Sequence, residues 1–139
     1  MPMTELSEAE SLHLLAGAPV GRIVISVNDI IDIYPVSHTV LDGAIYFRTA
    51  PGDKLAALAA NAAVLFEADE LTPTDAWSVV IHGLARRLEN DDEIEPVAST
   101  LRDPFVRGRR DVIVRIVPSA VSGRSFHPGD ADDEDDSPA

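Results

Sequence analysis

The sequence predicts a mainly β fold, a small antiparallel barrel or sandwich of six strands with a few short helices. Six segments are rich in β-branched residues or alternate between apolar and polar positions, as half-buried strands do. Few helices are predicted between these segments, so the crossovers that a parallel sheet needs are largely missing. With 139 residues, of which 45% are hydrophobic, the chain can form one domain with a core.

The first third of the chain predicts one helix and two strands. The capping-box pattern Ser7-Glu8-Ala9-Glu10 predicts a helix over about 8–16, with Gly17 as its C-cap. The segment VGRIVISV predicts a strand over 20–27, and Asn28-Asp29 is a turn signal. The segment IDIYPVSHTV predicts a second strand that is broken or kinked at Pro35, because proline cannot donate to a strand ladder.

The remaining elements follow a similar pattern. Asp42-Gly43 predicts a tight turn before a third strand, AIYFRT. An Ala/Leu-rich stretch over 53–61 predicts a helix, and VLFEA a fourth strand, followed by a polar loop over 69–75. The fifth strand is WSVVIHGLARRL, residues 91–102 are expected to be helical, and DVIVRIVPSAV is the sixth strand.

The fifth strand carries the only tryptophan. Alternation places Trp77, Val79 and Ile81 on one face and Ser78, Val80 and His82 on the other. Gly83 interrupts the strand and indicates a bulge or a close backbone approach. Trp77 is either a core or interface residue or a ring that covers a planar ligand.

Composition excludes several classes of function. The net charge of −13, from 24 acidic and 11 basic residues, opposes binding to nucleic acid. The absence of cysteine excludes disulfides and thiolate chemistry and fits a cytoplasmic protein. The N-terminus lacks the pattern of a signal peptide, and no apolar run is long enough for a membrane span.

The loop after the third strand is the strongest candidate site. A strand ends in Arg48-Thr49, a short Gly/Pro loop follows, and a helix opens at Asp53-Lys54. Backbone N–H groups at a helix start, a hydroxyl and fixed positive charge suit an anionic group such as a phosphate. The alternative is a plain turn with a solvated lysine.

Other candidate motifs are weaker. The four histidines show no metal-ligand spacing, so no metal site is expected, although His38 is notable because it follows Pro35. Nucleophile elbows, dinucleotide fingerprints and Walker loops are absent. Arg107-Gly108-Arg109-Arg110 is either a contact for a partner or anion, or a solvated loop. Residues 1–128 are expected to form one domain, and the acidic segment 129–139 a disordered tail.

Taken in order, VGRIVISV, IYPVSHTV, IYFRTAPGDKL, LFEAD, WSVVIHGLARRLEND and VIVRIVPSAVSGR resemble one family. The chain is similar to the pyridoxamine 5′-phosphate oxidase-like flavin-binding proteins, within the small actinobacterial and nitroimidazole-resistance-like branch. The similarity covers roughly residues 5–126. It implies a six-stranded split β-barrel that forms a homodimer, with two flavin mononucleotide (FMN) sites between the subunits.

The resemblance also assigns site residues. It implies that Arg48, Thr49 and Lys54 hold the phosphate. The backbone of Pro35, Val36, Ser37 and His38 would line the isoalloxazine ring. Trp77 and Ser78 lie on the strand that would reach the flavin of the partner subunit.

Two departures from the family pattern limit what the resemblance implies. The oxidase has an Arg-Lys pair at the start of the helix, where this chain has Asp53-Lys54. The oxidase's C-terminal substrate-binding segment is not recognisable. The expected function is therefore an FMN-dependent oxidoreductase acting on an unidentified small molecule. The alternatives are a deazaflavin-dependent reductase on the same barrel, a non-enzymatic flavin-binding protein, or a cofactor-free regulatory barrel.

Overall fold

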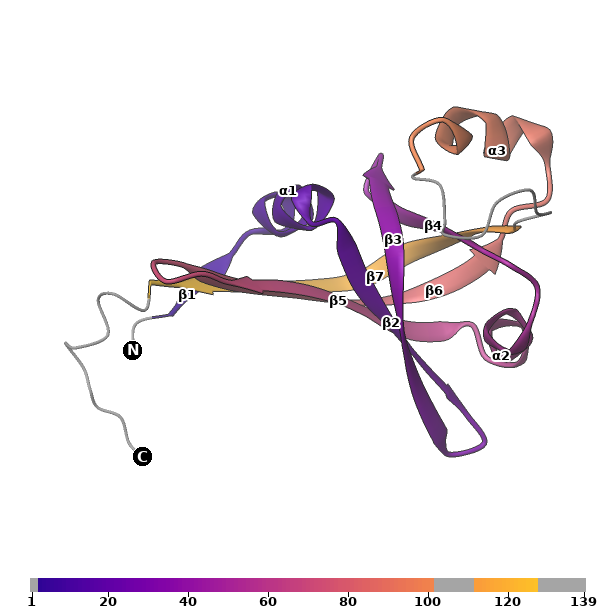
Figure 1. Ribbon diagram of the computed structural model, residues 1–139, viewed down its shortest axis with the longest axis horizontal. Coiled ribbons are helices and arrows are strands. Elements are labelled where there is room, and N and C mark those ends of the chain that lie inside the picture. The colour runs from indigo at the N-terminus through magenta and orange to yellow at the C-terminus, as the bar shows by residue number, and fades with distance from the viewer. Residues whose placement is uncertain (1–2, 102–111, 128–139) are drawn as a thin grey trace.

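The computed structural model describes residues 3–101 and 112–127, which form one sheet of seven strands with three helices against it (Figure 1). The strands are β1 (Thr4–Leu6), β2 (Val20–Val27), β3 (Ile30–Leu41), β4 (Ala44–Thr49), β5 (Ala63–Leu71), β6 (Ala76–Arg87) and β7 (Val112–Phe126). The helices are α1 (Glu8–Gly17), α2 (Asp53–Ala60) and α3 (Asp91–Ala98). No helix within the described ranges combines the length and apolar character that crossing a membrane would require.

Every strand pairing in this sheet is antiparallel, as predicted. The strand order is β1-β7-β4-β3-β2-β5-β6, and β6 also pairs with β7. Strands β2 to β7 therefore form a closed ring of hydrogen-bonded neighbours, which leaves few edges open to aggregation. The seventh strand, β1, was not predicted. It has three residues, and it exists because it pairs with residues 123–125 at the far end of the chain.

Both predicted hairpin turns are confirmed. Asn28 and Asp29 have φ values of 52° and 66°, and Asp42 and Gly43 have φ values of 52° and 79°. Two consecutive residues with positive φ give a turn whose twist matches that of antiparallel strands. Asn, Asp and Gly adopt this conformation at the lowest cost. These local signals set the β2–β3 and β3–β4 pairings.

The predicted break at Pro35 is wrong, because β3 is continuous and Pro35 lies opposite Arg22 of β2. This half of β3 pairs only with β2 among the described strands, and proline is tolerated at such an edge. The predicted C-cap is also wrong by one residue. Gly17 ends α1, and Ala18 caps it by donating its N–H to the carbonyl of Leu15.

Three predicted boundaries shift as well. Strand β5 runs on to Leu71, into the segment predicted as a loop, and β7 runs to Phe126. Both extensions pair with β6, which supplies hydrogen bonds that the local sequence does not reveal. Helix α3 ends at Ala98, earlier than the predicted residue 102, which itself lies outside the described residues. The basic segment 107–110 and the acidic segment 129–139 also lie outside them.

The predicted interruption of β6 is confirmed. The pairing register with β7 shifts between His82 and Gly83. A Cβ at Gly83 would lie 2.7 Å from the carbonyl oxygen of Val117, so the two backbones approach too closely for a side chain. The predicted alternation also holds, since Val79 and Ile81 are fully buried and His82 is exposed.

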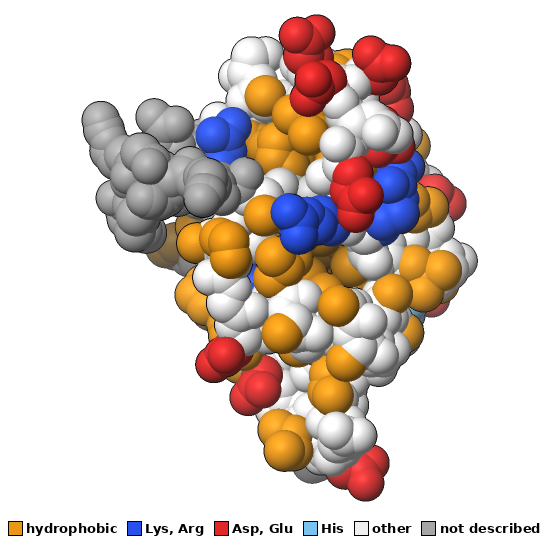
Figure 2. Space-filling model, turned by 90° about the vertical axis from the view of Figure 1, so that its right-hand side faces the viewer, with side chains coloured by type: hydrophobic (Ala, Val, Ile, Leu, Met, Phe, Trp, Pro, Cys, Tyr) orange, Lys and Arg blue, Asp and Glu red, His pale blue; other side chains and the backbone are white. Residues whose placement is uncertain are grey.

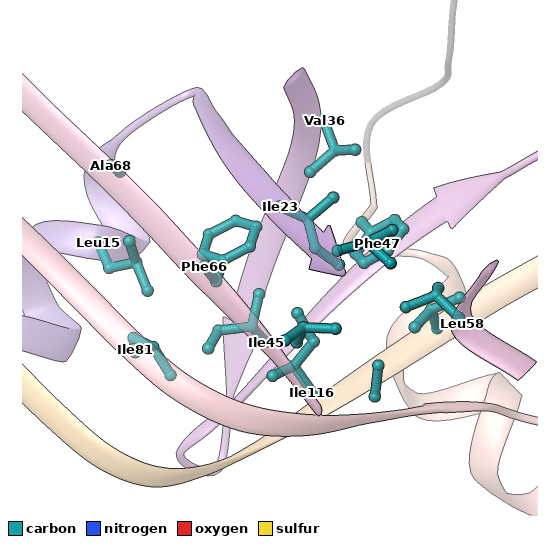
Figure 3. Close-up of a cluster of buried hydrophobic side chains, with 14 of the residues drawn as sticks. Leu15, Ile23, Val36, Ile45, Phe47, Leu58, Phe66, Ala68, Ile81 and Ile116 are labelled. Atoms are coloured by element: carbon teal, nitrogen blue, oxygen red, sulfur yellow. The ribbon is translucent and has the colours of Figure 1, made fainter. Parts of the chain in front are cut away.

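The main core lies inside the ring of strands (Figure 3). Side chains of the strands meet Leu15 from α1 and Leu58 from α2, so both helices close the core. Fully burying an aliphatic or aromatic side chain of this kind contributes roughly 1.5–3 kcal/mol. A second cluster lies beneath α3 and contains Ala44, Tyr46, Leu88, Val97, Leu101 and Ile113. Strand β4 separates the two clusters, because its alternate side chains face opposite ways.

Candidate functional site

The N-terminus of α2 offers free backbone donors. Gly52 occupies the N-cap and has no side chain to accept a hydrogen bond, and the first helical bond runs from the N–H of Ala56 to the carbonyl of Gly52. The preceding N–H groups, those of residues 53–55, therefore have no acceptor within the helix. Uncapped N–H groups and the positive end of the helix dipole attract an anion such as a phosphate.

Lys54 lies in the first turn of α2 and packs inward. Its Nζ is 5.2 Å from the ring centre of Tyr34 and 5.8 Å from that of Phe47. Burial lowers the pKa of Lys54 from its ordinary value, because the protein replaces part of the water around the ammonium group. No carboxylate pairs with it among the described residues. A half-buried cation in this position gains more from binding an anion than a solvated lysine does. Lys54 is therefore not fully solvated, and whether the loop holds an anion is left to the binding experiments below.

Thr49 ends β4 on the same face as Phe47, the ring over which Lys54 lies. Its hydroxyl is buried and donates only a long bond of 3.3 Å to the carbonyl of Ala50. That weak bond can be exchanged for a stronger one to an anion. The structure thus brings two of the three predicted phosphate residues, Thr49 and Lys54, to one side of the loop.

Arg48 lies on the opposite face of β4. Its Nη2 donates a 2.9 Å hydrogen bond to the carbonyl of Ala98, at the C-terminal end of α3. Its Nε is buried and has no hydrogen-bond partner among the described residues. A cation at a helix C-terminus is favourable, so this contact fastens α3 to the sheet. The structure does not bring Arg48 together with Lys54.

The predicted ring-binding segment lies in the middle of β3. Pro35 is exposed and Ser37 is half-buried, whereas Val36 and His38 face the core. His38 Nε2 donates a 2.8 Å hydrogen bond to the carbonyl of Leu15, and its ring meets that of Phe66 edge to face at 5.0 Å. The His38 side chain therefore ties β3 to α1.

Trp77 and Ser78 lie at the start of β6, next to its turn with β5, and this turn is at the other end of the molecule from α2 (Figure 1). Trp77 pairs with Ser125 of β7, whereas Thr49 pairs with Val112, thirteen residues away on the same strand. At ~3.3 Å per residue, the two pairing positions are roughly 40 Å apart along β7. One chain therefore cannot place Trp77 and Lys54 on the same small molecule.

Two features near these residues were missed from the sequence. Tyr34 contacts Lys54, and only the β2–β3–β4 pairing places it there. A charged cluster spans β2 and β5, where Arg22 Nη2 lies 2.7 Å from Glu67 and 3.1 Å from Asp69. Burial raises the pKa of Glu67, and a hydrogen bond from Glu67 lowers that of Asp69. The available signal was one arginine within the otherwise uncharged segment of β2, and acidic residues at alternate positions, Glu67 and Asp69, in β5.

In the described part of the chain, no three His, Cys, Asp or Glu side chains gather as metal ligands would. Together, the closed antiparallel sheet and the uncapped start of α2 define the class of the protein: a β domain with a helix N-terminus suited to an anion. The sequence model of pyridoxamine 5′-phosphate oxidase matches residues 7–125. The chain belongs to the pyridoxamine 5′-phosphate oxidase-like family.

Solved structures of similar proteins agree. A Corynebacterium glutamicum protein, provisionally assigned as a pyridoxamine 5′-phosphate oxidase, is 42% identical with a TM-score of 0.82 over 91% of this chain and 94% of that one. The FAD binding protein of Mycobacterium smegmatis is 33% identical with a TM-score of 0.79, over 89% and 98% of the two chains. A Bacteroides thetaiotaomicron protein, provisionally assigned to 5-nitroimidazole antibiotic resistance, shares the fold at 14% identity and a TM-score of 0.71, over 91% and 90%.

Proposed function

We propose that this chain binds a flavin, with FMN as the expected cofactor, and that Lys54, Thr49 and the N-terminus of α2 hold its phosphate. The observation that carries the proposal is the uncapped start of α2 beside a half-buried lysine. Backbone donors, a hydroxyl and a cation lie on one side of one loop, which is the donor set that phosphate requires. The FAD binding protein of M. smegmatis, 33% identical over nearly its whole length, supports a flavin-type ligand.

The site requires a second copy of the chain. Trp77 and Ser78 are too far from Lys54 to reach the same cofactor within one chain. In a homodimer, the β6 strand of one subunit could complete the site that α2 of the other begins. We therefore propose two equivalent composite sites related by a two-fold axis.

The outer face of the sheet offers a surface for this dimer. Ile31 and Ile33 of β3 are 68% and 60% exposed. Val24 of β2 lies between Ile33 and Leu65 of β5 in the pairing register, so apolar residues continue across three strands. The β2–β3 hairpin projects from the body of the molecule, and hydrophobic side chains extend towards its tip (Figures 1 and 2). An exposed apolar surface of this kind marks an interface.

As an enzyme, the protein would be an oxidoreductase acting on a small molecule. The flavin would supply the hydride-transfer chemistry. This chain's residues would bind the phosphate, orient the ring and exclude water from it. We assign no catalytic side chain.

A cofactor-free regulatory barrel is the second candidate, and two observations favour it. Asp53 places a negative charge in the first turn of α2, next to the proposed phosphate. Arg48, the other predicted cation, is engaged with α3 instead. Both features lower the expected affinity for a phosphate. A deazaflavin cofactor on the same site, or a flavin carrier without catalysis, would leave the phosphate contacts unchanged.

Binding experiments separate these candidates. The purified protein is titrated with FMN, FAD, a deazaflavin and riboflavin, and the quenching of cofactor fluorescence is measured. Saturable binding of FMN with much weaker binding of riboflavin is expected, because riboflavin lacks the phosphate. A protein that binds none of the four is the cofactor-free barrel. Bleaching of the bound flavin by a reduced nicotinamide would then distinguish an enzyme from a carrier.

A further inference from the structure

A concave surface lies at the end of the molecule away from α2. It is a pocket of about 680 Å³ between α1, the β5–β6 turn and the end of β7. That volume falls within the range of about 300–1,000 Å³ that small-molecule sites occupy. None of the phosphate-loop residues lines it.

The inner surface of this pocket is apolar and contains a fixed aromatic ring. Its apolar lining consists of Leu6, Ala9, Leu14, Ala76 and Trp77. Trp77 packs partly against the main core, and its Nε1 donates a 3.2 Å hydrogen bond to Glu70. These two contacts hold the indole in one orientation. A ring held in this way favours stacking against a planar ligand.

The charged groups at the pocket are mostly acidic. Glu10, Glu70 and Asp75 line it together with His13 and His127. Glu10 accepts the N–H of Ser7 at 2.9 Å, and Asp75 lies 2.6 Å from His127, so both carboxylates are fixed in place. A concave surface with a negative potential repels anions and concentrates cations.

Among the residues that the structure describes, no lysine or arginine lines this pocket to offset the carboxylates. Arg22 lies in the adjoining hollow, which shares Trp77 with the pocket, but its guanidinium is already paired with Glu67 and Asp69. The uncompensated negative charge therefore disfavours an anionic ligand.

We propose that this pocket is a binding site for a planar, largely apolar small molecule that is neutral or positively charged. Trp77 stacks on the ligand, and the carboxylates at the rim exclude anions. This role depends on the proposed function. The ligand is then the substrate, and Trp77 positions it beside the flavin of the partner subunit. The existence of the site itself depends only on the pocket.

The test uses Trp77 as the reporter, because it is the only tryptophan in the chain. The full-length protein is titrated with 9-aminoacridine, a planar cation, and with acridine-9-carboxylate, an anion of the same ring system. Saturable quenching by the cation is expected, with affinity at least ~10-fold above that of the anion at low salt and a smaller difference at high salt.

Variants locate the site. Trp77→Ala should weaken binding of the cation by about 3- to 10-fold in calorimetry, whereas Trp77→Phe, which keeps an aromatic ring, should retain most of it. Glu70→Gln keeps an acceptor for the Trp77 indole but removes a negative charge. It should therefore reduce the ratio of the affinity for the cation to the affinity for the anion. Leu84→Ala is the control, because Leu84 is an exposed apolar residue on the same strand and does not line the pocket.

Titration in the presence of saturating FMN separates the two proposals. Cation binding that is unchanged by FMN and by Lys54→Ala supports a distinct ligand site. Cation binding in a protein that binds no flavin supports this site while refuting the proposed function. Competitive displacement by FMN would overturn the inference, because the pocket would then belong to the flavin. Equal affinity for the anion, or no saturable binding, would also overturn it.

Discussion

At the scale of residues, the candidate site depends on one lysine. Lys54 is the only lysine in the chain, and the structure places it half-buried on two aromatic rings beside the uncapped start of α2. A charge-assisted hydrogen bond contributes roughly 1.5–3 kcal/mol. Lys54→Ala should therefore weaken FMN binding by about 10- to 100-fold, at 1.4 kcal/mol per tenfold. Flavin fluorescence titration measures the change.

Riboflavin is the matched control for this prediction. It should bind weakly to the parent and respond little to Lys54→Ala, because it has no phosphate. Asp53→Arg, which restores the oxidase-like pair of cations, should tighten FMN binding by removing a like charge. If Lys54→Ala binds FMN as tightly as the parent does, the phosphate assignment is wrong and the loop is only a turn.

The pKa of Lys54 can be measured directly because the residue is unique. Burial lowers this pKa below 10.5 in the folded state, so the unfolded chain binds more protons between the two values. The free energy of unfolding should therefore rise with pH through that window, and Lys54→Met should remove this contribution. Reductive ¹³C-methylation followed by NMR titration reports the pKa. Added FMN should raise it, and an unchanged pKa on saturation with FMN would place the phosphate elsewhere.

At the scale of elements, α1 is fixed by close contact with β7. Ser11 is fully buried, its hydroxyl donates a 2.8 Å hydrogen bond to the carbonyl of Ser7, and a Cβ added at Gly123 would overlap that hydroxyl. Gly123→Ala should destabilise the protein by about 1–3 kcal/mol, as overpacking does. Chemical denaturation measures the loss.

A double-mutant cycle tests the cause of that loss. Ser11→Gly removes the side chain that the new methyl group meets. The free energy of unfolding of the double variant should therefore fall by less than the sum of the decreases in the two single variants. Gly17→Ala is the control, because no atom lies within 4 Å of a Cβ at that position. Additive losses for Ser11 and Gly123 would show that the contact between α1 and β7 is not the cause.

At the scale of the whole molecule, the composite flavin site proposed above needs a second copy of the chain. We predict a homodimer in solution, and obligate interfaces bury on the order of 2,000 Å² or more. Ile31→Lys should dissociate the dimer and reduce flavin binding without unfolding the subunit, since Ile31 is 68% exposed. Leu84→Lys, at an exposed apolar residue outside the β2–β3 hairpin, should remain dimeric. A monomeric mass for the parent at micromolar concentration, by sedimentation, would contradict the prediction.

We also predict that residues 129–139 are dispensable for folding and flavin binding. The six carboxylates of this segment repel one another, and the family match ends at residue 125. Deletion of 129–139 should leave the melting temperature and the flavin affinity nearly unchanged. A large decrease in either, by calorimetry or titration, would show that the segment has a binding role.

The sequence alone determined the features that depend on neighbouring residues. The capping box of α1, the two turns with positive φ, the bounds of β2 and β4 and the interruption at Gly83 follow from local chemistry, and all are found in the structure. The order of motifs also identified the family. Local patterns suffice here because caps, turns and strand periodicity involve residues only a few positions apart.

Only the tertiary structure decided how these elements combine. Strand β1, the continuity of β3 through Pro35 and the extension of β7 depend on partners distant in sequence. Three features of the candidate sites also depend on such distant partners. They are the placement of Arg48 against α3 rather than beside Lys54, the contact of Tyr34 with Lys54, and the pocket around Trp77. A strand pattern gives the alternation of faces but not what each face meets. Contacts between residues far apart in the chain are set by which strands pair, and only the closed sheet fixes that.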